Sequence, residues 1–570
     1  MPRSTASGVV WWRTAPSEGC RLPVLRYVRR VGTVYRNGPI HSLTNPDARA
    51  LLVVDGKIAW LGADDQVPAL TGVHEVIDVE DCLIAPGFVD AHAHVLETGM
   101  ALTGLDLGPG SGVASLADVL EAVAAGADEL RGAGGGVVLG HGWDESSWPE
   151  LRPPTRLELD RAAQGLAVYL SRTDLHSAVV SSVLAASSGC KELPGWHDDG
   201  VVTSEAHERA RAVAREVSDP RREVLCRTAL QAAAARGVVS VHEHSVPALD
   251  TRDGLRALMR LCADPAGGLP GVVGYRAELC ETTRDARALL ADLPGLAGIG
   301  GDLTVDGSIG SRSAALRAPY ADADGRGELL ISAEQVANHV SAVTGAGVPA
   351  AFHVIGDRAM DELLLGLQAA GDVEGIEVIR AGHHRIEHGE MLDARALAHI
   401  VLFGLTMSVQ PAFDALWGGA DGMYARRLGP VRAADMNPFA DLVAAGVPMA
   451  FGSDSPVTPI DPWAGVAAAA GHHERGQRIP AGIAFRAHTR GGWRAARREQ
   501  NGAGELRVGA PASFAVWQTE VPPSAATHVL GGSQGSAHPL GGALLPVLAE
   551  GAAPPLCRRT VRDGVVIFKG

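Results

Sequence analysis

The feature that most constrains the fold of this chain is the alternation of short apolar strands with alanine-rich helical stretches through its middle. This order is typical of βα units around a parallel sheet. Eight parallel strands with intervening helices close naturally into a barrel. The eight candidate strands are residues 87–94, 237–244, 271–278, 303–307, 348–354, 381–388, 404–410 and 447–454. The sequence therefore predicts an α/β fold, a (β/α)8 TIM-like barrel over residues 87–489.

Further strands are predicted at the two opposite ends of the chain. Near the start, residues 50–62 contain two β-rich runs that are joined by Asp55-Gly56, a strong hairpin signal. Near the end, a second Asp-Gly step at 563–564 lies within a similar pattern. Strands at both ends that flank a long middle predict a composite β-sandwich domain, built from residues 32–86 and 490–570.

The first two predicted barrel strands are separated by residues 95–236, far more than one crossover helix needs. We therefore expect a large insertion, at about residues 106–232, near the barrel mouth. Residues 1–31 are rich in arginine and lack the continuous apolar run of a signal peptide. We expect them to form a disordered N-terminal extension.

Composition narrows the class of partner. The net charge of −15 argues against nucleic acid or an anionic membrane surface, and no apolar run is long enough to span a membrane. The seven cysteines are scattered without a Cys-x-x-Cys pair, which favours reduced thiols in a cytoplasmic protein. The expected partner is a small molecule.

Histidines and an aspartate stand at the ends of separate predicted strands. His92 and His94 lie two residues apart, so both side chains point to one face and can bind one ion. His353, His388 and Asp454 end three later strands. Each residue alone is equally well explained as a satisfied polar group, so the prediction rests on their order. Four imidazoles and a carboxylate at strand ends, where barrel active sites lie, suit Zn²⁺ or a similar divalent ion.

Several motifs are highly specific in combination. They lie at residues 86–94, 142–144, 306–314, 353–359, 385–388 and 452–456. Together they resemble the amidohydrolase superfamily, and more narrowly its YtcJ-like branch, which includes N-substituted formamide deformylases. The resemblance runs from about residue 32 to the end of the chain. It implies a (β/α)8 barrel, a composite β-sandwich, and one or two divalent metals at the barrel mouth.

The resemblance also implies roles for individual residues. His92, His94, His353 and His388 are implied to be metal ligands, and Asp454 is implied to be both a ligand and the general base. The implied reaction is hydrolysis of a non-peptide C–N bond in a small molecule by metal-activated water. Barrels of this type often pair, so a homodimer is a further expectation.

The sequence departs from the family at one position. The family usually has a lysine four residues before the Asp-Gly step of the fourth strand region, where a carbamylated lysine can bridge two metals. Here that position is Asp302, and the three lysines of the chain, Lys57, Lys191 and Lys569, lie elsewhere in the sequence. Asp302 is thus a carboxylate bridge, or a structural residue at a strand start beside a single metal. A mononuclear or asymmetric site is the preferred hypothesis.

Other residues are candidates for contact with the substrate. The resemblance suggests that Trp143 and His176 line the pocket, whereas the residues alone favour a packed tryptophan and a surface histidine. Asp306 begins a glycine-rich loop that we expect to line the site. Arg312, in the same loop, is either a contact to a substrate carboxylate or carbonyl, or one half of an ordinary ion pair. Residues 242–244 are candidates for orienting the metal ligands.

Two alternative functions remain open. The first is another reaction in the same scaffold, such as deamination, C–O hydrolysis or isomerisation, because the same ligands serve all of them. The second is a non-catalytic, metal-binding regulatory protein, which the departure at Asp302 favours. The presence of all four histidines together with Asp454 argues against it, because a binding protein has no need of a base beside a metal.

Overall fold

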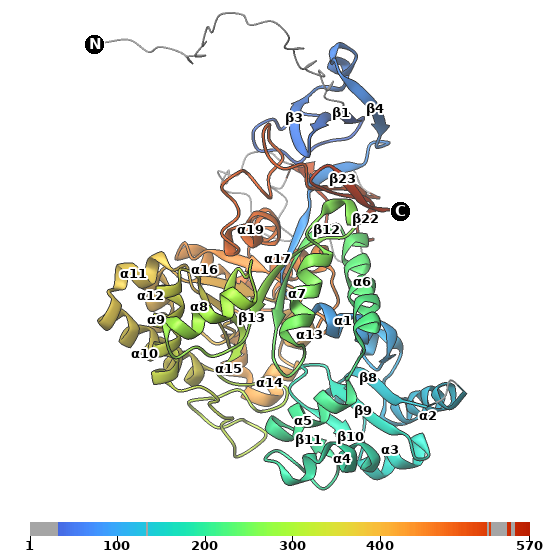
Figure 1. Cartoon of the computed structure of the whole chain (residues 1–570), viewed down its shortest axis with the longest axis vertical. Coiled ribbons are helices and arrows are strands. Elements are labelled where there is room, and N and C mark those ends of the chain that lie inside the picture. Colours follow the sequence, from blue (N-terminus) through green and yellow to red (C-terminus); the bar gives the residue numbers. More distant parts are fainter. Residues whose placement is uncertain (1–31, 133–134, 521–523, 526–543, 549–552) are drawn as a thin grey trace, which may run out of the picture.

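The computed structural model describes residues 32–132, 135–520, 524–525, 544–548 and 553–570 (Figure 1). The predicted N-terminal extension, residues 1–31, lies outside this part of the chain. The central feature is an eight-stranded sheet in the order β18-β17-β16-β15-β14-β13-β12-β6, in which all neighbours are parallel. Its strands are β6 (Phe88–Ala93), β12 (Val238–Ser245), β13 (Gly271–Arg276), β14 (Gly298–Thr304), β15 (Ala350–Val354), β16 (Arg385–His388), β17 (Thr406–Val409) and β18 (Met449–Phe451).

The sheet is a nearly closed barrel. The first strand, β6, contacts the residues that follow the last strand, β18: the amide of Asp454 donates to the carbonyl of His92 at 2.8 Å. The amide of His94 likewise donates to the carbonyl of Ser455 at 2.9 Å. The predicted α/β fold with eight parallel strands is confirmed, and each predicted segment overlaps one strand of the sheet.

The fourth strand differs from its prediction. It runs from Gly298 to Thr304, whereas residues 303–307 were expected. Because this strand contains several glycines, it lacks the alternation of apolar and polar residues that marks a strand in sequence. The glycines are nevertheless required, because neighbouring atoms lie too close for a side chain. A Cβ atom on Gly300 would lie 2.0 Å from the carbonyl oxygen of Ala351, and both Gly300 and Gly301 have positive φ. Asp302 therefore lies inside β14, and the expectation that it stands at a strand start is wrong.

Helices surround the barrel and begin at recognisable caps. Thr282 and Ser332 each accept a hydrogen bond from the third amide of the helix that follows, α8 (Thr283–Asp292) or α9 (Ala333–Ala346), and the backbone amide of each cap donates back to the side chain of that third residue. None of the helices in the described ranges is long and apolar enough to cross a membrane. The helices after β12 are α7 (Arg252–Leu261), α8 (Thr283–Asp292), α9 (Ala333–Ala346), α10 (Asp357–Glu374), α11 (Ile376–Ala381), α12 (Ala394–Phe403), α13 (Pro411–Trp417), α14 (Met423–Leu428), α15 (Pro430–Ala434), α16 (Phe439–Ala444), α17 (Pro462–Gly471), α18 (Ala481–Arg486) and α19 (Gly492–Ala495).

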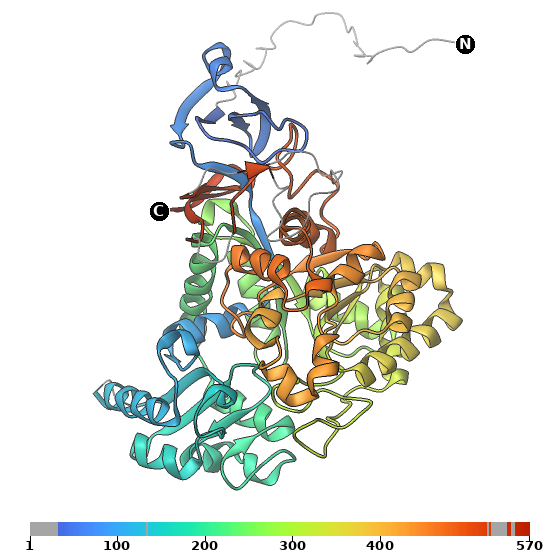
Figure 2. The ribbon, with the colours of Figure 1, turned by 180° about the vertical axis from the view of Figure 1, so that it is seen from behind.

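The chain between β6 and β12 contains a second, five-stranded sheet in the order β11-β10-β9-β8-β7. Its strands are β7 (Leu105–Asp106), β8 (Val137–Trp143), β9 (Ala167–Arg172), β10 (Ala178–Val180) and β11 (Val201–Val202). The helices of this segment are α1 (Val95–Thr103), α2 (Leu116–Gly132), α3 (Arg156–Ala163), α4 (Ser182–Ser188), α5 (Ser204–Ala214) and α6 (Asp219–Ala235). Residues 105–214 form a lobe at one end of the molecule in both views (Figures 1 and 2).

Two small sheets lie at the opposite end of the molecule (Figures 1 and 2). The first has the order β3-β2-β1-β4 and the second the order β23-β22-β19-β5. Because β5 pairs antiparallel with β19, segments from both ends of the chain share one sheet. Their strands are β1 (Gly32–Arg36), β2 (Ala50–Val54), β3 (Lys57–Gly62), β4 (Val73–Asp78), β5 (Leu83–Pro86), β19 (Phe514–Gln518), β22 (Leu556–Arg562) and β23 (Val565–Lys569). The predicted domain boundaries stay a prediction.

Trp517 on β19 joins the second small sheet to the barrel. Its ring lies 5.8 Å from that of Phe88 on β6 and 5.5 Å from that of Trp463 on α17, and its side chain is 2% exposed. We expect Trp517→Ala to lower the free energy of unfolding by about 3–5 kcal/mol, because a large cavity would remain in the core. Denaturant unfolding measures this loss. The control Leu402→Ala, at a residue 41% exposed on α12, should cost less than about 0.5 kcal/mol. Equal losses in the two variants would contradict the proposed role of Trp517.

Candidate metal centre

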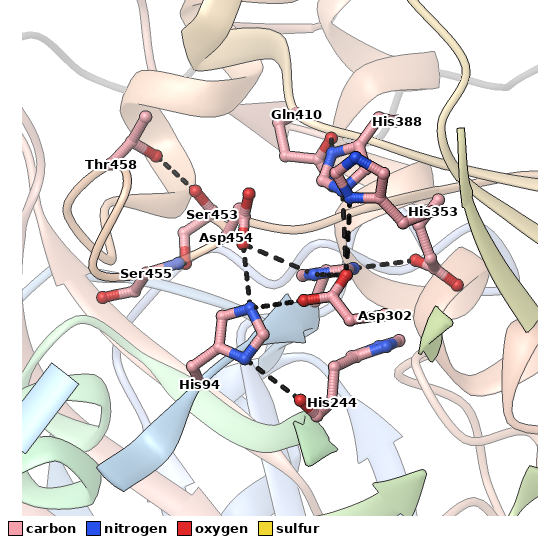
Figure 3. A network of polar contacts seen from close by, with 12 residues as sticks. His94, His244, Asp302, His353, His388, Gln410, Ser453, Asp454, Ser455 and Thr458 are labelled. Carbon is pink, nitrogen blue, oxygen red and sulfur yellow. Dashed lines mark hydrogen bonds and ion pairs between the residues drawn. The ribbon is translucent and has the colours of Figure 1, made fainter. Parts of the chain in front are cut away.

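The predicted ligands converge at the carboxyl ends of the barrel strands (Figure 3). His92 lies at the end of β6 and His94 directly follows it, Asp302 lies on β14, His353 on β15, His388 at the end of β16, and Asp454 after β18. The four histidines and Asp454 are buried, and Asp302 is nearly so. Residues far apart in the sequence therefore share one site because the strands of a barrel end together.

Asp302 occupies the middle of this site. Its Oδ2 lies 3.0 Å from Nε2 of His94, and its Oδ1 lies 3.4 Å from Nε2 of His92. On the other side, Oδ1 lies 3.7 Å from Nδ1 of His353 and 3.9 Å from Nε2 of His388. One carboxylate thus faces two pairs of imidazoles, which is the arrangement that a bridging ligand between two cations requires.

Asp454 lies beside the first imidazole pair. Its Oδ1 is 3.4 Å from Nε2 of His92 and 3.3 Å from Nε2 of His94. Both Asp454 and His388 have left-handed backbone, with φ of 55° and 69°. This conformation turns the chain at the strand end and departs from the simple alternation of faces along a strand.

Each histidine is oriented by an acceptor on the far side of its ring. The acceptors are Oε2 of Glu387 for His92 at 2.9 Å, the carbonyl of His244 for His94 at 3.0 Å, Oε1 of Gln410 for His388 at 2.9 Å, and the carbonyl of Gly307 for His353 at 3.4 Å. A ring that donates through one nitrogen has a lone pair on the other, and here that other nitrogen faces Asp302.

The donor set fits a divalent cation. Nε2 of His92, Nε2 of His388 and Oδ1 of Asp302 are buried and have no hydrogen-bond partner among the described residues. Unpartnered buried acceptors are costly, and imidazole with carboxylate is a typical ligand set for zinc and related ions. Groups of three ligand atoms lie within 4.8 Å of one another in the combinations His92–His94–Asp302, Asp302–His353–His388 and His92–His388–Asp454.

The electrostatics of the site favour positive charge. Burial alone would lower the pKa of His92, but Asp302 and Asp454 outweigh burial and raise that pKa to about 10. The same two carboxylates raise the pKa of His94 well above its ordinary value, against the effect of burial. Two buried carboxylates therefore attract either protons on the imidazoles or a metal cation.

Charged residues inside the barrel support the ligands. Glu387, which accepts from His92, is fully buried and pairs with Arg385, whose Nε lies 2.8 Å from Oε1. Burial raises the pKa of Glu387, but Arg385 and His92 outweigh it and hold that pKa low. Sequence reasoning singled out neither residue. The available signal was a pair of opposite charges two positions apart on one short strand, so that both side chains point to the same face. His244, among the predicted orienting residues, stacks on His92 with ring centroids 3.9 Å apart.

A cavity of about 570 Å³ lies over the metal centre. His94, Asp302, His353, His388 and Asp454 form part of its wall, and residues 174–211 of the lobe form much of the rest. The size is suitable for a small molecule. His176 lines the cavity, and its ring lies 5.1 Å from that of His353. Burial and then the charge of His353 lower the pKa of His176 to about 4, so its ring is neutral at neutral pH.

The structure does not bring Trp143, Asp306 or Arg312 to the described lining of this cavity. Trp143 is packed in the core of the lobe, where its Nε1 donates to the carbonyl of Leu170. Asp306 is buried and accepts hydrogen bonds from three backbone amides at 2.8–2.9 Å, including that of Ile355. Arg312 donates twice to Asp322. The ordinary ion pair left open for Arg312 is therefore the interaction that forms.

Comparison with known proteins gives consistent matches. Residues 75–568 match a family model described as the amidohydrolase family. The chain is 25% identical over 460 residues to the Bacillus subtilis amidohydrolase YtcJ, covering 76% of this chain and 83% of that protein. It is 32% identical over 139 residues to an N-substituted formamide deformylase of Arthrobacter pascens, covering 24% of this chain and 25% of that protein. A crystal structure of an uncharacterized metal-dependent hydrolase from Pyrococcus furiosus superposes with a TM-score of 0.64 and 25% identity, over 85% of this chain and 98% of that chain.

The geometry predicts a structural role for Asp306. In Asp306→Asn one acceptor oxygen is replaced by an NH₂ group, so at least one buried amide is left without an acceptor. We expect a loss of about 1–3 kcal/mol in the free energy of unfolding, with KM unchanged. The control Arg312→Gln breaks a partly exposed ion pair and should cost less than about 1 kcal/mol. A raised KM without loss of stability in Asp306→Asn would instead indicate contact with substrate.

Proposed function

The chain belongs to the amidohydrolase family, in its YtcJ-like branch, and on that premise we propose that it hydrolyses a non-peptide C–N bond of a small molecule. The observation that most supports this proposal is the convergence of four oriented imidazoles and two carboxylates beneath a cavity of about 570 Å³. The relative named N-substituted formamide deformylase acts, by its name, on an amide of a small molecule.

We propose that the site holds two divalent ions, with Zn²⁺ as the best fit to its ligands. His92 and His94 would hold one ion, His353 and His388 the other, and Asp302 would bridge them, which departs from the single-metal hypothesis. Asp302 would thus take the place of the bridging lysine in related sequences. When bound, such ions lower the pKa of a coordinated water and polarise a carbonyl oxygen.

Asp454 is proposed as the general base. Its amide is held by the carbonyl of His92, and the preceding residue, Ser453, donates from its amide and its hydroxyl to the buried carboxylate of Asp90 at 2.9 and 2.6 Å. The Asp454 carboxylate accepts a proton from the attacking water as the water oxygen bonds to the carbonyl carbon. It then gives that proton to the nitrogen as the C–N bond breaks, so that an amide and water become an acid and an amine.

The cavity wall would bind and orient the substrate. Neutral His176 can donate one hydrogen bond and accept another beside the reacting carbon. Arg211 also lines the cavity, and its Nη2 is held by the carbonyl of Leu175 while its Nε has no partner among the described residues.

The partner and the cellular compartment of the enzyme are proposed from its composition. A net charge of −15 supports a small molecule, rather than nucleic acid or a membrane, as the partner. We place the enzyme in the cytoplasm, in line with its free cysteines in the described ranges. A homodimer is the proposed assembly.

Metal content tests the bridging role of Asp302. After reconstitution with Zn²⁺ and dialysis, we expect about two equivalents per chain in the wild type, by elemental mass spectrometry. Asp302→Ala should retain at most one, because the ligand shared by both sites is gone. The control Asp322→Ala removes a carboxylate that pairs with Arg312 and Arg427, outside the site, and should retain both. One equivalent in the wild type would contradict the bridge, and none would contradict the metal-dependent reaction.

Turnover tests the role of Asp454. Release of amine from a panel of N-substituted formamides and other small amides provides the assay. We expect Asp454→Asn to keep metal and to lower kcat by about 10²–10⁴-fold, because an amide cannot accept the proton. Asp322→Asn is the matched control and should stay near the wild-type rate. Near wild-type turnover by Asp454→Asn would rule out its role as the base.

A further inference from the structure

A second cavity, of about 580 Å³, lies at the other end of the barrel strands. Ser240 near the start of β12 and Gly271 at the start of β13 form part of its wall. The end of α7, α19 with the segment that follows it, and the second small sheet with its loops form the rest. The metal ligands lie at the carboxyl ends of the strands, so the two cavities are separated by the length of the barrel.

Arginines dominate the charge of this second cavity. Arg497 and Arg498 follow α19, and Arg562 ends β22. The carboxylate that lines the described wall is that of Asp563, and it already accepts from the hydroxyl of Ser513 at 3.1 Å. Three guanidinium groups thus face one partly engaged carboxylate, which leaves an excess of positive charge.

The arginine side chains have free hydrogen-bonding capacity. Arg497 and Arg498 make no ion pair or side-chain hydrogen bond with any residue in the described ranges, whereas Arg172, Arg317 and Arg427 each bind carboxylates. Arg562 has a side chain only 13% exposed, and its Nε forms a long ion pair with Oδ2 of Asp563 at 3.9 Å. Its Nη1 donates to the carbonyls of Cys262 and Leu269 at 2.8 and 3.0 Å, and its Nη2 has no acceptor among the described residues.

Two neutral donors in the same wall are also unpartnered. Nε1 of Trp493 and the hydroxyl of Ser240 are buried and have no hydrogen-bond partner within the described part of the chain. A buried donor without an acceptor is costly, so each calls for an acceptor nearby. The free groups that these residues offer are predominantly donors, and most of the charge is positive.

We propose that this cavity binds a small organic anion that carries a phosphate or carboxylate group. The planar fork of an arginine pairs with either group through two parallel hydrogen bonds, and three arginines from separate segments can hold more than one negative charge. A volume of about 580 Å³ accommodates a ligand of metabolite size. Binding here requires no metal, because none of the metal ligands lines the cavity.

The test uses the full-length holoenzyme and two probes, inorganic phosphate and succinate, at an ionic strength held constant with chloride. We expect calorimetric titration to show saturable binding of at least one probe, with a matching rise in Tm. The double variant Arg497→Gln/Arg498→Gln should bind that probe at least about tenfold more weakly, since the charge-assisted hydrogen bonds of two guanidinium groups are lost. The probe that binds more tightly identifies the ligand group.

The control is the double variant Arg475→Gln/Arg494→Gln. It removes the same charge from exposed positions outside the described cavity wall and should bind like the wild type. Unchanged binding in Arg497→Gln/Arg498→Gln would mean that the probe binds elsewhere on the protein, and it would overturn the proposal. Absence of saturable binding of both probes to the wild type would overturn it as well. Neither result depends on whether the proposed hydrolysis is correct.

Discussion

The metal centre depends on two buried carboxylates and on the positive charge that must balance them. A charged carboxylate removed from water is costly unless positive charge lies against it, and Asp302 and Asp454 stand together at the end of the barrel. The imidazoles around them present lone pairs, because each ring already donates on its far side. The centre is therefore built for a cation. Only a nearly closed ring of parallel strands brings residues 92 and 454 into this contact.

Much of this centre was predictable from the order of residues, because the carboxyl ends of all barrel strands converge. The His92–His94 pair and the three later strand ends needed no further information. The position of Asp302 could not be derived in the same way. A strand that contains Gly300 and Gly301 shows no apolar alternation, and its glycines are required by the close approach of Ala351 and His244. In a sequence, the only sign that another segment approaches the backbone closely is the glycine itself.

Side-chain partners were the part that the sequence could not supply. In an arginine-rich chain each guanidinium group could pair with many different carboxylates. Which pair forms depends on which loops the fold brings together. Arg427 on α14 binds both Glu145 of the lobe and Asp322 of the loop after β14, and Asp322 in turn binds Arg312. Through these ion pairs the lobe contacts the helix α14 and the loop after β14. The same network also engages Arg312, the arginine that the motif alone offered as a substrate contact.

Polar residues occupy one face of β12 between the two ends of the barrel. Ser240, His242 and His244 occupy alternate positions on β12 and so share one face. Ser240 lines the second cavity. Nδ1 of His242 accepts a hydrogen bond from Arg385 at 3.0 Å. The ring of His244 stacks on that of His92. Buried hydrogen bonds of this kind are strengthened by the low dielectric around them. An anion bound at one end and the metal ligands at the other would therefore both lie against the same face of β12, which is polar rather than apolar.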